Sequence, residues 1–463
     1  MKKLCIQIFL LCYCLSLSMA AGARDLQAEY RDAYLTSVAA ASCLGVYTPY
    51  DSTEFSYMRY HGWEVIPYTQ KEEGIKAHYS VAKNSCPESR QVVYMVTIKG
   101  SSTKGDWKVN FKTDQVNFGG RDINAMEELA KQPKVKQGPT VHRGFNAYTD
   151  VILHSSVVDE ESRLQGLYRL VQEDPDTYLL LTGHSLGGAV ATLLGQRLIS
   201  LGLPPEKLMV ITFGAPAIGN DVFAQQYGER MRLLRVTNTA DPVPGSLQTF
   251  FGGYKQFGRN IKYSISTKIN DMQHDISLYT DYSISRYYAL YDEAVAAGLD
   301  EYLPYRRDTQ GVPLVALWIQ SSPEIAAKDY VPNVKRLISD EYKLLLPSYV
   351  VVDNNLDMGN YSHGDILRAS KEAGADYVLI VGIDGHQLRQ DTQWYIALDQ
   401  GLFTIEGDML SMGRFATKVL PAVGTINATG QLFLDAKNVL AEKLPFPLET
   451  SKLSLPNWRG GKS

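Results

Sequence analysis

The sequence of 463 residues lacks the features that mark several classes of protein. It has five cysteines and eight histidines, and no group of them has the spacing of a zinc site. No segment repeats at a fixed period, which argues against a solenoid or a propeller. Basic residues form no stripe, and the formal net charge is −4, a poor basis for binding nucleic acid. We therefore expect no zinc site and no nucleic-acid partner.

The apolar run near the start, over residues 4–17, is shorter than the roughly 20 residues that span a bilayer. Two lysines precede it and small residues follow it, which is the pattern of a secretory signal. We expect residues 1–23 to be a signal peptide and the chain to be periplasmic or secreted. Cleavage after Ala20 and cleavage after Ala23 both fit, and an uncleaved anchor is the alternative.

Removal of the signal peptide takes the formal net charge from −4 to −6 and leaves two cysteines, Cys43 and Cys86. An exported chain with two cysteines permits one disulfide. Two buried thiols are an equal alternative.

The length exceeds the size at which a single core stops growing, so we expect two domains. Residues 306–311, with the sequence RRDTQG, are polar and without periodicity. We place a linker there, between a first domain over 24–305 and a smaller one over 312–450, with a tail over 451–463. We expect the first domain to fold without the second.

Short apolar and helical stretches alternate along the first domain, which predicts an α/β fold with a mostly parallel sheet covered on both faces. The expected strands cover residues 91–98, 178–182, 208–213 and 233–238, and the expected helices cover 26–41, 144–154, 160–171, 186–200 and 274–297. The pattern restarts in the second domain and predicts a small α/β unit. Its expected strands are 312–319, 349–353, 376–383, 392–398 and 430–434, and its expected helices are 332–345 and 363–373.

The chain contains the pattern G-x-S-x-G at residues 183–187, directly between a predicted strand and a predicted helix. This is where a nucleophile elbow places a reactive serine, so we predict that Ser185 is a nucleophile. A glycine-rich turn that packs a helix onto a sheet is the alternative.

A serine nucleophile needs a base, and the base needs a carboxylate that orients it. In α/β-hydrolases the order along the chain is serine, acid, histidine. Asp241 follows a predicted strand, and His274 is the histidine after it in the same domain. We predict these two as acid and base, and expect His184 to face inward and His142 to be structural.

The negative charge that develops on the substrate carbonyl needs preorganised donors. The backbone N–H of Leu186, at a helix N-terminus, is one expected donor of this oxyanion hole. Ser101 follows an earlier strand and is the second expected donor.

Five ordered blocks in the first domain resemble the class 3 lipase family, the fungal triacylglycerol lipase type, over roughly residues 26–297. The resemblance implies an α/β-hydrolase fold, a Ser185–His274–Asp241 triad, and neither metal nor organic cofactor. The stretch before His274 is shorter than in the family. The blocks are IKGSSTKGDW at 98–107, VHRGF at 141–145, LTGHSLGGAVATLL at 181–194, TFGAP at 212–216 and NTADPVP at 238–244.

The resemblance implies a carboxylic ester hydrolase of the lipase or phospholipase type that forms an acyl-enzyme. Acyl transfer to an alcohol would use the same intermediate. A third alternative is a non-catalytic scaffold whose second domain binds a protein partner. That second domain resembles the amino-terminal domain of TolB-like periplasmic proteins, and we expect it to bind or anchor.

In lipases of this family the segment after the oxyanion loop forms a lid over the serine. Read as a helix, residues 104–111 place Trp107 and Phe111 on one face and Lys104 and Lys108 on an adjacent one. We expect this segment to contact the substrate and a membrane surface, with a preference for anionic phospholipids over neutral triglyceride.

Overall fold

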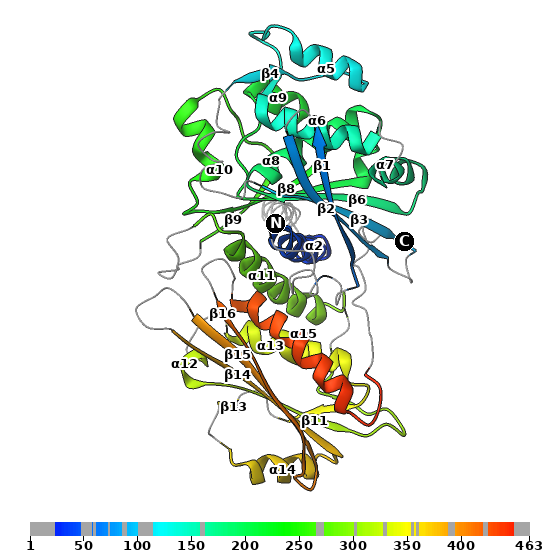
Figure 1. Cartoon of the computed structure of the whole chain (residues 1–463), viewed down its shortest axis with the longest axis vertical. Coiled ribbons are helices and arrows are strands. Elements are labelled where there is room, and N and C mark those ends of the chain that lie inside the picture. The colour runs from blue at the N-terminus through cyan, green and yellow to red at the C-terminus, as the bar shows by residue number, and fades with distance from the viewer. Residues whose placement is uncertain are drawn as a thin grey trace, which may run out of the picture.

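We describe the protein from a computed structural model, which contains two α/β units stacked end to end (Figure 1). The structure describes residues 24–47, 58, 62–72, 75–85, 90–100, 114–157, 163–264, 273–300, 303–326, 331–352, 356–357, 361–387, 394–419 and 425–448. The predicted signal peptide, the tail, Cys86, Ser101 and the expected lid residues lie outside these ranges.

The first unit is built on a seven-stranded sheet in the order β1-β2-β3-β6-β7-β8-β9. The first three strands are antiparallel, and β3 to β9 run parallel to one another. The predicted parallel α/β architecture is therefore confirmed. The strands are β1 Glu64–Glu72, β2 Ile75–Ser85, β3 Val92–Ile98, β6 Thr177–His184, β7 Leu208–Phe213, β8 Arg232–Asn238 and β9 Arg259–Tyr263.

Helices cover both faces of this sheet and enclose two cores. One core packs α6, α7 and α8 onto the strands, and the other packs α2 and α11 onto the opposite face. Every residue of β6 is buried, which explains its continuous apolar run. The helices are α2 Leu26–Gly45, α5 Ile123–Lys131, α6 Arg143–Val157, α7 Arg163–Glu173, α8 Leu186–Ser200, α9 Asp221–Tyr227, α10 Val243–Ser246 and α11 Ile276–Ala296, with the short strands β4 Gln115–Asn117 and β5 Thr140–His142 beside them.

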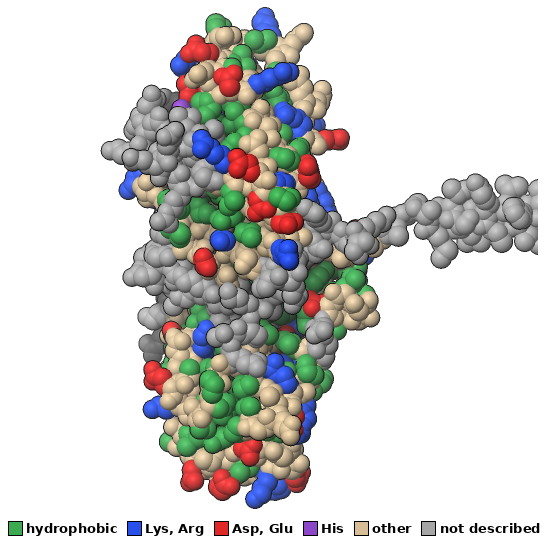
Figure 2. Space-filling view, turned by 90° about the vertical axis from the view of Figure 1, so that its right-hand side faces the viewer, with side chains coloured by type: hydrophobic (Ala, Val, Ile, Leu, Met, Phe, Trp, Pro, Cys, Tyr) green, Lys and Arg blue, Asp and Glu red, His purple; other side chains and the backbone are tan. Residues whose placement is uncertain are grey.

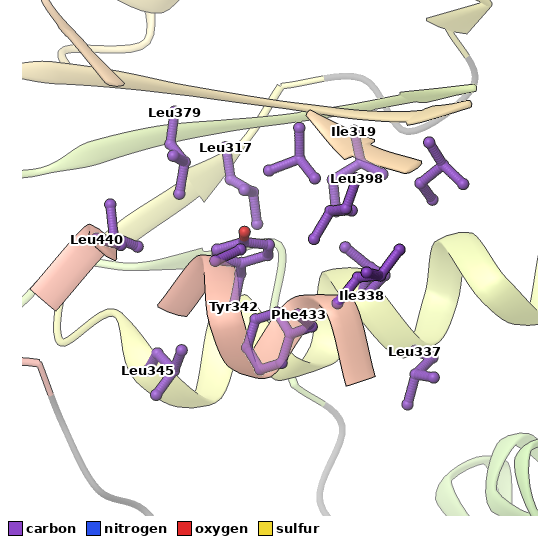
Figure 3. Close-up of a cluster of buried hydrophobic side chains, with 14 of the residues drawn as sticks. Leu317, Ile319, Leu337, Ile338, Tyr342, Leu345, Leu379, Leu398, Phe433 and Leu440 are labelled. Atoms are coloured by element: carbon purple, nitrogen blue, oxygen red, sulfur yellow. The ribbon is translucent and has the colours of Figure 1, made fainter. Parts of the chain in front are cut away.

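The second unit has its own mixed sheet in the order β10-β12-β11-β14-β15-β16, with β13 beside β11. Helices α13 and α15 pack on one face through a cluster that includes Tyr342 and Phe433 (Figure 3), and α14 packs on the other. The strands are β10 Arg306–Arg307, β11 Val315–Ser321, β12 Tyr349–Val351, β13 Leu356–Asp357, β14 Tyr377–Gln387, β15 Trp394–Thr404 and β16 Met409–Val419, and the helices are α12 Pro323–Ala326, α13 Val331–Leu345, α14 His363–Glu372 and α15 Thr425–Lys443.

The structure corrects one predicted strand of the second unit. Residues 430–434 lie inside α15, where buried Ala428, Leu432, Ala436 and Leu440 recur every four residues. The short apolar run therefore belongs to a helix that is buried on several sides in this part. The predicted linker also contains β10, so its first two residues belong to the second sheet.

The surface carries both signs of charge. On the face shown in Figure 2, lysines and arginines are interspersed with acidic residues over both units. Among the described residues, no helix is both long and apolar enough to cross a membrane. No group of three acidic, histidine or cysteine side chains in the described ranges could hold a metal ion.

Candidate active site

Ser185 stands in a sharp turn between β6 and α8. Its φ of 58° and ψ of −126° lie in a region that non-glycine residues rarely adopt, as expected of a strained elbow. Two glycines make the turn possible. A Cβ on Gly183 would lie 2.3 Å from the carbonyl carbon of Gly187, and a Cβ on Gly187 would lie 2.1 Å from the Ile98 carbonyl oxygen. Strand and helix therefore approach too closely for side chains at either position.

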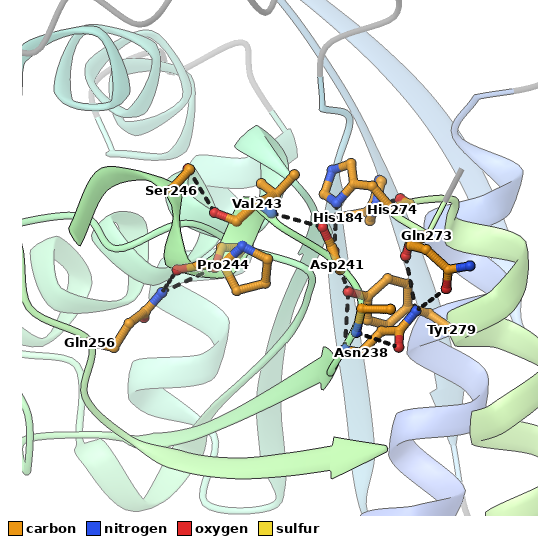
Figure 4. A network of polar contacts seen from close by, with 12 residues as sticks. His184, Asn238, Asp241, Val243, Pro244, Ser246, Gln256, Gln273, His274 and Tyr279 are labelled. Carbon is orange, nitrogen blue, oxygen red and sulfur yellow. Dashed lines mark hydrogen bonds and ion pairs between the residues drawn. The ribbon is translucent and has the colours of Figure 1, made fainter. Parts of the chain in front are cut away.

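Asp241 follows β8, and its side chain is fully buried. Three donors satisfy the carboxylate: Oδ1 accepts the Val243 N–H at 2.9 Å, and Oδ2 accepts His274 Nδ1 at 2.7 Å and the Tyr279 hydroxyl at 2.5 Å (Figure 4). A buried carboxylate needs such donors, because a buried polar group without partners is costly. The structure thus joins two of the predicted triad residues, 33 positions apart in the chain.

Tyr279 is a site residue that the sequence analysis missed. It is completely buried on α11, five positions after His274, and burial together with the charge of Asp241 raises the pKa of its hydroxyl. The phenol is therefore a donor that stays protonated. The sequence signal was only a tyrosine-rich helix, in which no spacing singles out this tyrosine.

Gly214 lies directly below the acid–base pair, at the end of β7. Its φ of +56° is in the left-handed region that favours glycine. A Cβ here would lie 2.9 Å from Asp241 Oδ2, 2.9 Å from the Tyr279 hydroxyl and 3.0 Å from His274 Cε1. The missing side chain gives these three groups room to meet above the strand between β6 and β8.

The residues on either side of His274 are fixed by hydrogen bonds, which positions His274 between them. Asn238, the last residue of β8, donates its side-chain amide to the Gln273 carbonyl at 3.1 Å and to the Gln273 side chain at 3.0 Å. Asp275 caps α11 by accepting the Ser277 N–H at 3.0 Å. The imidazole is 19% exposed, so it lies at the border between the core and the surface.

His184 packs on the ring of His274, with 4.5 Å between ring centroids. Its Nε2 lies 2.8 Å from the His274 carbonyl oxygen, which only accepts, so Nε2 carries the proton. Nδ1 then accepts from the Tyr47 hydroxyl at 3.2 Å, and that hydroxyl accepts the Gly100 N–H at 3.2 Å. Burial, and then the proximity of His274, hold the pKa of His184 well below its usual value. As expected, His184 faces inward, and it is a neutral support for His274.

The loop after β3 runs beside the elbow. β3 and β6 are paired in parallel with Ile98 opposite Gly183, and a Cβ on Gly100 would lie 3.4 Å from Ser185 Cβ. Leu186 is the first residue of α8, next to Ser185. The position of Gly100 is consistent with an oxyanion donor from this loop, although Ser101 itself lies beyond the described residues.

Two other residues have structural roles. His142 is buried, and its Nδ1 accepts the N–H groups of Gly144 and Phe145 at the start of α6, at 3.1 and 3.3 Å. The expectation that His142 is structural is confirmed. Cys43 is a free, buried thiol 3.4 Å from Thr182 Oγ1, and burial raises its pKa to about 12.

Comparisons with known proteins support the resemblance to the class 3 lipases. Residues 95–250 match the model of the family described as lipase (class 3). A secreted mono- and diacylglycerol lipase of Fusarium solani is 31% identical over 163 residues, which cover 34% of this chain and 40% of that protein. Phospholipase A1-II 4 of Oryza sativa subsp. japonica is 34% identical over 121 residues, which cover 23% and 30%. The chain therefore spans less than half of the length of these relatives.

The solved structures include lipase II from Rhizopus niveus, which is 18% identical, covers 51% of this chain and 81% of its own, and has a TM-score of 0.39. The lipase of Rhizomucor miehei, in complex with its propeptide, is also 18% identical, covers 50% and 67%, and has a TM-score of 0.40. The family resemblance predicted from the sequence is confirmed over the matched segment.

Proposed function

We propose that this chain, whose residues 95–250 match the class 3 lipases, hydrolyses carboxylic esters with Ser185 as nucleophile, His274 as base and Asp241 as orienting acid. The observation that carries the proposal is the hydrogen-bonded pair of His274 and Asp241, which lies at the same edge of the sheet as the strained Ser185 elbow. All three residues follow the carboxyl ends of parallel strands or precede α11, where this fold places its chemistry.

In this mechanism His274 Nε2 takes the Ser185 proton as the hydroxyl attacks the acyl carbonyl. Asp241 holds Nδ1–H, and thereby fixes the tautomer and stabilises the imidazolium. Donation from the Leu186 N–H, and from Ser101 if its loop follows the family pattern, stabilises the oxyanion. His274 then protonates the departing alcohol, and water releases the acid from the acyl-enzyme by the same steps.

The charge state of His184 supports this chemistry. A second imidazolium stacked on His274 would oppose protonation of the base in the transition state. Because burial keeps His184 neutral, the positive charge that forms on His274 meets no second charge from this ring and lies against the carboxylate of Asp241. A histidine in this position therefore orients the base without competing for the proton.

The substrate class that we propose is a lipid ester. The matched relatives are named as a mono- and diacylglycerol lipase and a phospholipase A1, so acylglycerols and phospholipids are both candidates. The basic residues of the expected lid favour an anionic phospholipid surface. We also propose that the chain is exported, because its first residues have the pattern of a signal peptide and the fungal relative is named as secreted.

The test is hydrolysis of a soluble p-nitrophenyl ester by the purified mature chain, compared with Ser185→Ala. The control is Ser200→Ala, at the far end of the same helix, where the hydroxyl donates to the Gln196 carbonyl at 2.9 Å and accepts from Arg230 Nη1 at 3.5 Å. We expect Ser185→Ala to lose the activity while remaining folded, and Ser200→Ala to keep it. A folded Ser185→Ala chain with wild-type turnover would rule out the proposal.

A further inference from the structure

Helix α11 contributes side chains to one hydrophobic core of each unit. Ile276 and Tyr279, in its first turn, lie in the core of the first sheet. Ile284 and Tyr288 lie in the core of the second sheet, with residues of α13, α15 and β11. At a rise of about 1.5 Å per residue, the two regions are within roughly 20 Å along one rigid element. The helix that begins beside His274 thus runs between the two units (Figure 1), and its last turns pack on α2 through Leu290 and Ala294.

The first unit holds α11 mainly through α2. The Thr280 hydroxyl donates to the Ala40 carbonyl at 3.3 Å, and the rings of Tyr287 and Tyr30 stack with centroids 5.9 Å apart. These contacts cover one side of the helix and leave the Ile284 and Tyr288 side to be covered by the C-terminal unit.

The C-terminal unit contacts this second side of α11 through a charged residue as well as through its hydrophobic core. Arg336 of α13 forms an ion pair with Asp292, and its guanidinium lies 5.3 Å from the ring centroid of Tyr288 and 5.0 Å from that of Tyr291. Its Nη1 also donates to the Tyr288 carbonyl at 3.5 Å. The Arg336 side chain is 21% exposed and that of Asp292 is 59% exposed, so the contacts with the two rings are better shielded from solvent than the ion pair.

We infer that the C-terminal unit positions the catalytic base: by packing on the second half of α11 it fixes the helix at whose N-terminus His274 and Tyr279 stand. The inference rests on the proposed function, because it assigns His274 that role. Ile284, Tyr288 and Arg336 are then positioning residues that act through α11. A small displacement of a catalytic group by a distant change reduces turnover strongly. On this inference, residues 24–305 alone turn over esters more slowly than the full chain.

The experiment uses the full chain and compares Arg336→Ala with Arg414→Ala. Arg414 is a matched control in the same unit, since it pairs with Asp384 and Asp399 and lies against Tyr395, but on β16 and away from α11. On a soluble p-nitrophenyl ester we expect Arg336→Ala to lower kcat about five-fold with KM unchanged. Arg414→Ala should match the wild type. Arg336→Lys keeps the charge but not the planar stacking, so it should be intermediate, and it replaces the alanine variant if that chain does not fold.

Hydrogen exchange of the α11 backbone gives a second readout that needs no activity. We expect amides of residues 277–283 to exchange faster in Arg336→Ala and at the wild-type rate in Arg414→Ala. Unchanged kcat in Arg336→Ala overturns the inference. An equal fall in both variants, or a fall in Arg336→Ala without faster exchange, also contradicts it. A wild-type chain that hydrolyses no ester would instead refute the proposed function, and the exchange rates would still test the role of the C-terminal unit.

Discussion

Replacing Tyr279 by phenylalanine removes one hydroxyl from the Asp241 carboxylate and leaves the buried ring in place. The carboxylate then keeps two of its three donors, the Val243 N–H and His274 Nδ1. A hydrogen bond to a charged group contributes about 1.5–3 kcal/mol. We expect the free energy of unfolding at pH 7 to fall by about 2 kcal/mol, because the bond is short and Asp241 is fully buried.

The same change loosens the acid–base pair. With one donor fewer, the Asp241 carboxylate is held less firmly in the position that orients His274. Because a small displacement of a catalytic group reduces turnover strongly, we expect kcat to fall about five-fold with KM unchanged.

The assay is hydrolysis of a soluble p-nitrophenyl ester at one fixed pH by the wild type, Tyr279→Phe and Tyr263→Phe. Tyr263 is the control, because its ring packs 5.4 Å from that of Tyr279, and its buried hydroxyl has no hydrogen-bond partner among the described residues. Tyr263→Phe should leave kcat unchanged. An unchanged kcat in Tyr279→Phe, or the same fall in both variants, would show that the Tyr279 hydroxyl does not position the acid–base pair.

Three further changes test other parts of the account. Gly214→Ala should cost about 1–3 kcal/mol of stability in chemical denaturation and lower kcat sharply, because the strained φ and the new Cβ both disturb the acid–base pair; wild-type kinetics would contradict this. Asp32→Ala leaves the guanidinium groups around this buried carboxylate uncompensated, so unfolding should require about 2 kcal/mol less while kcat stays within two-fold in the folded chain. Lys104→Glu with Lys108→Glu should reduce the preference for anionic phospholipid vesicles and spare soluble esters, and the preference should shrink as salt rises. A rate that jumps at the solubility limit of a neutral triglyceride in both chains would refute the lid hypothesis.

The parts of the fold that the sequence predicted are those with strong local patterns. β6 is an unbroken buried strand that ends in a glycine-rich turn, so its position and the elbow after it follow from the sequence alone. β16 was missed because this edge strand, MLSMGRFATKV, mixes apolar, small and basic residues without a clear period of two. α15 was misread because a short apolar run such as Leu432 to Leu434 does not distinguish a strand from a helix.

The residues of the candidate site likewise divide into those that the sequence predicted and those that it did not. Asp241 and His274 were predicted from chain order, because this fold fixes the order of acid and base. Tyr279, Gly214 and Asn238 could not be predicted, since their roles arise from strands and helices that meet only in three dimensions. The sharing of α11 between two cores was hidden for the same reason. A helix with apolar residues on several sides indicates burial but not which partners bury it.

The central claim is that the acyl group of the substrate is transferred to Ser185, and mass spectrometry of the trapped intermediate tests it most directly. The chain is mixed with a p-nitrophenyl ester, quenched in acid within milliseconds to seconds, and digested. We predict that the acyl group is found on the peptide containing Ser185, that His274→Ala accumulates far less of it in the same time, and that Ser185→Ala carries none. Rapid hydrolysis with the acyl group on another residue, or with acylation of Ser185 unaffected by His274→Ala, would contradict the account.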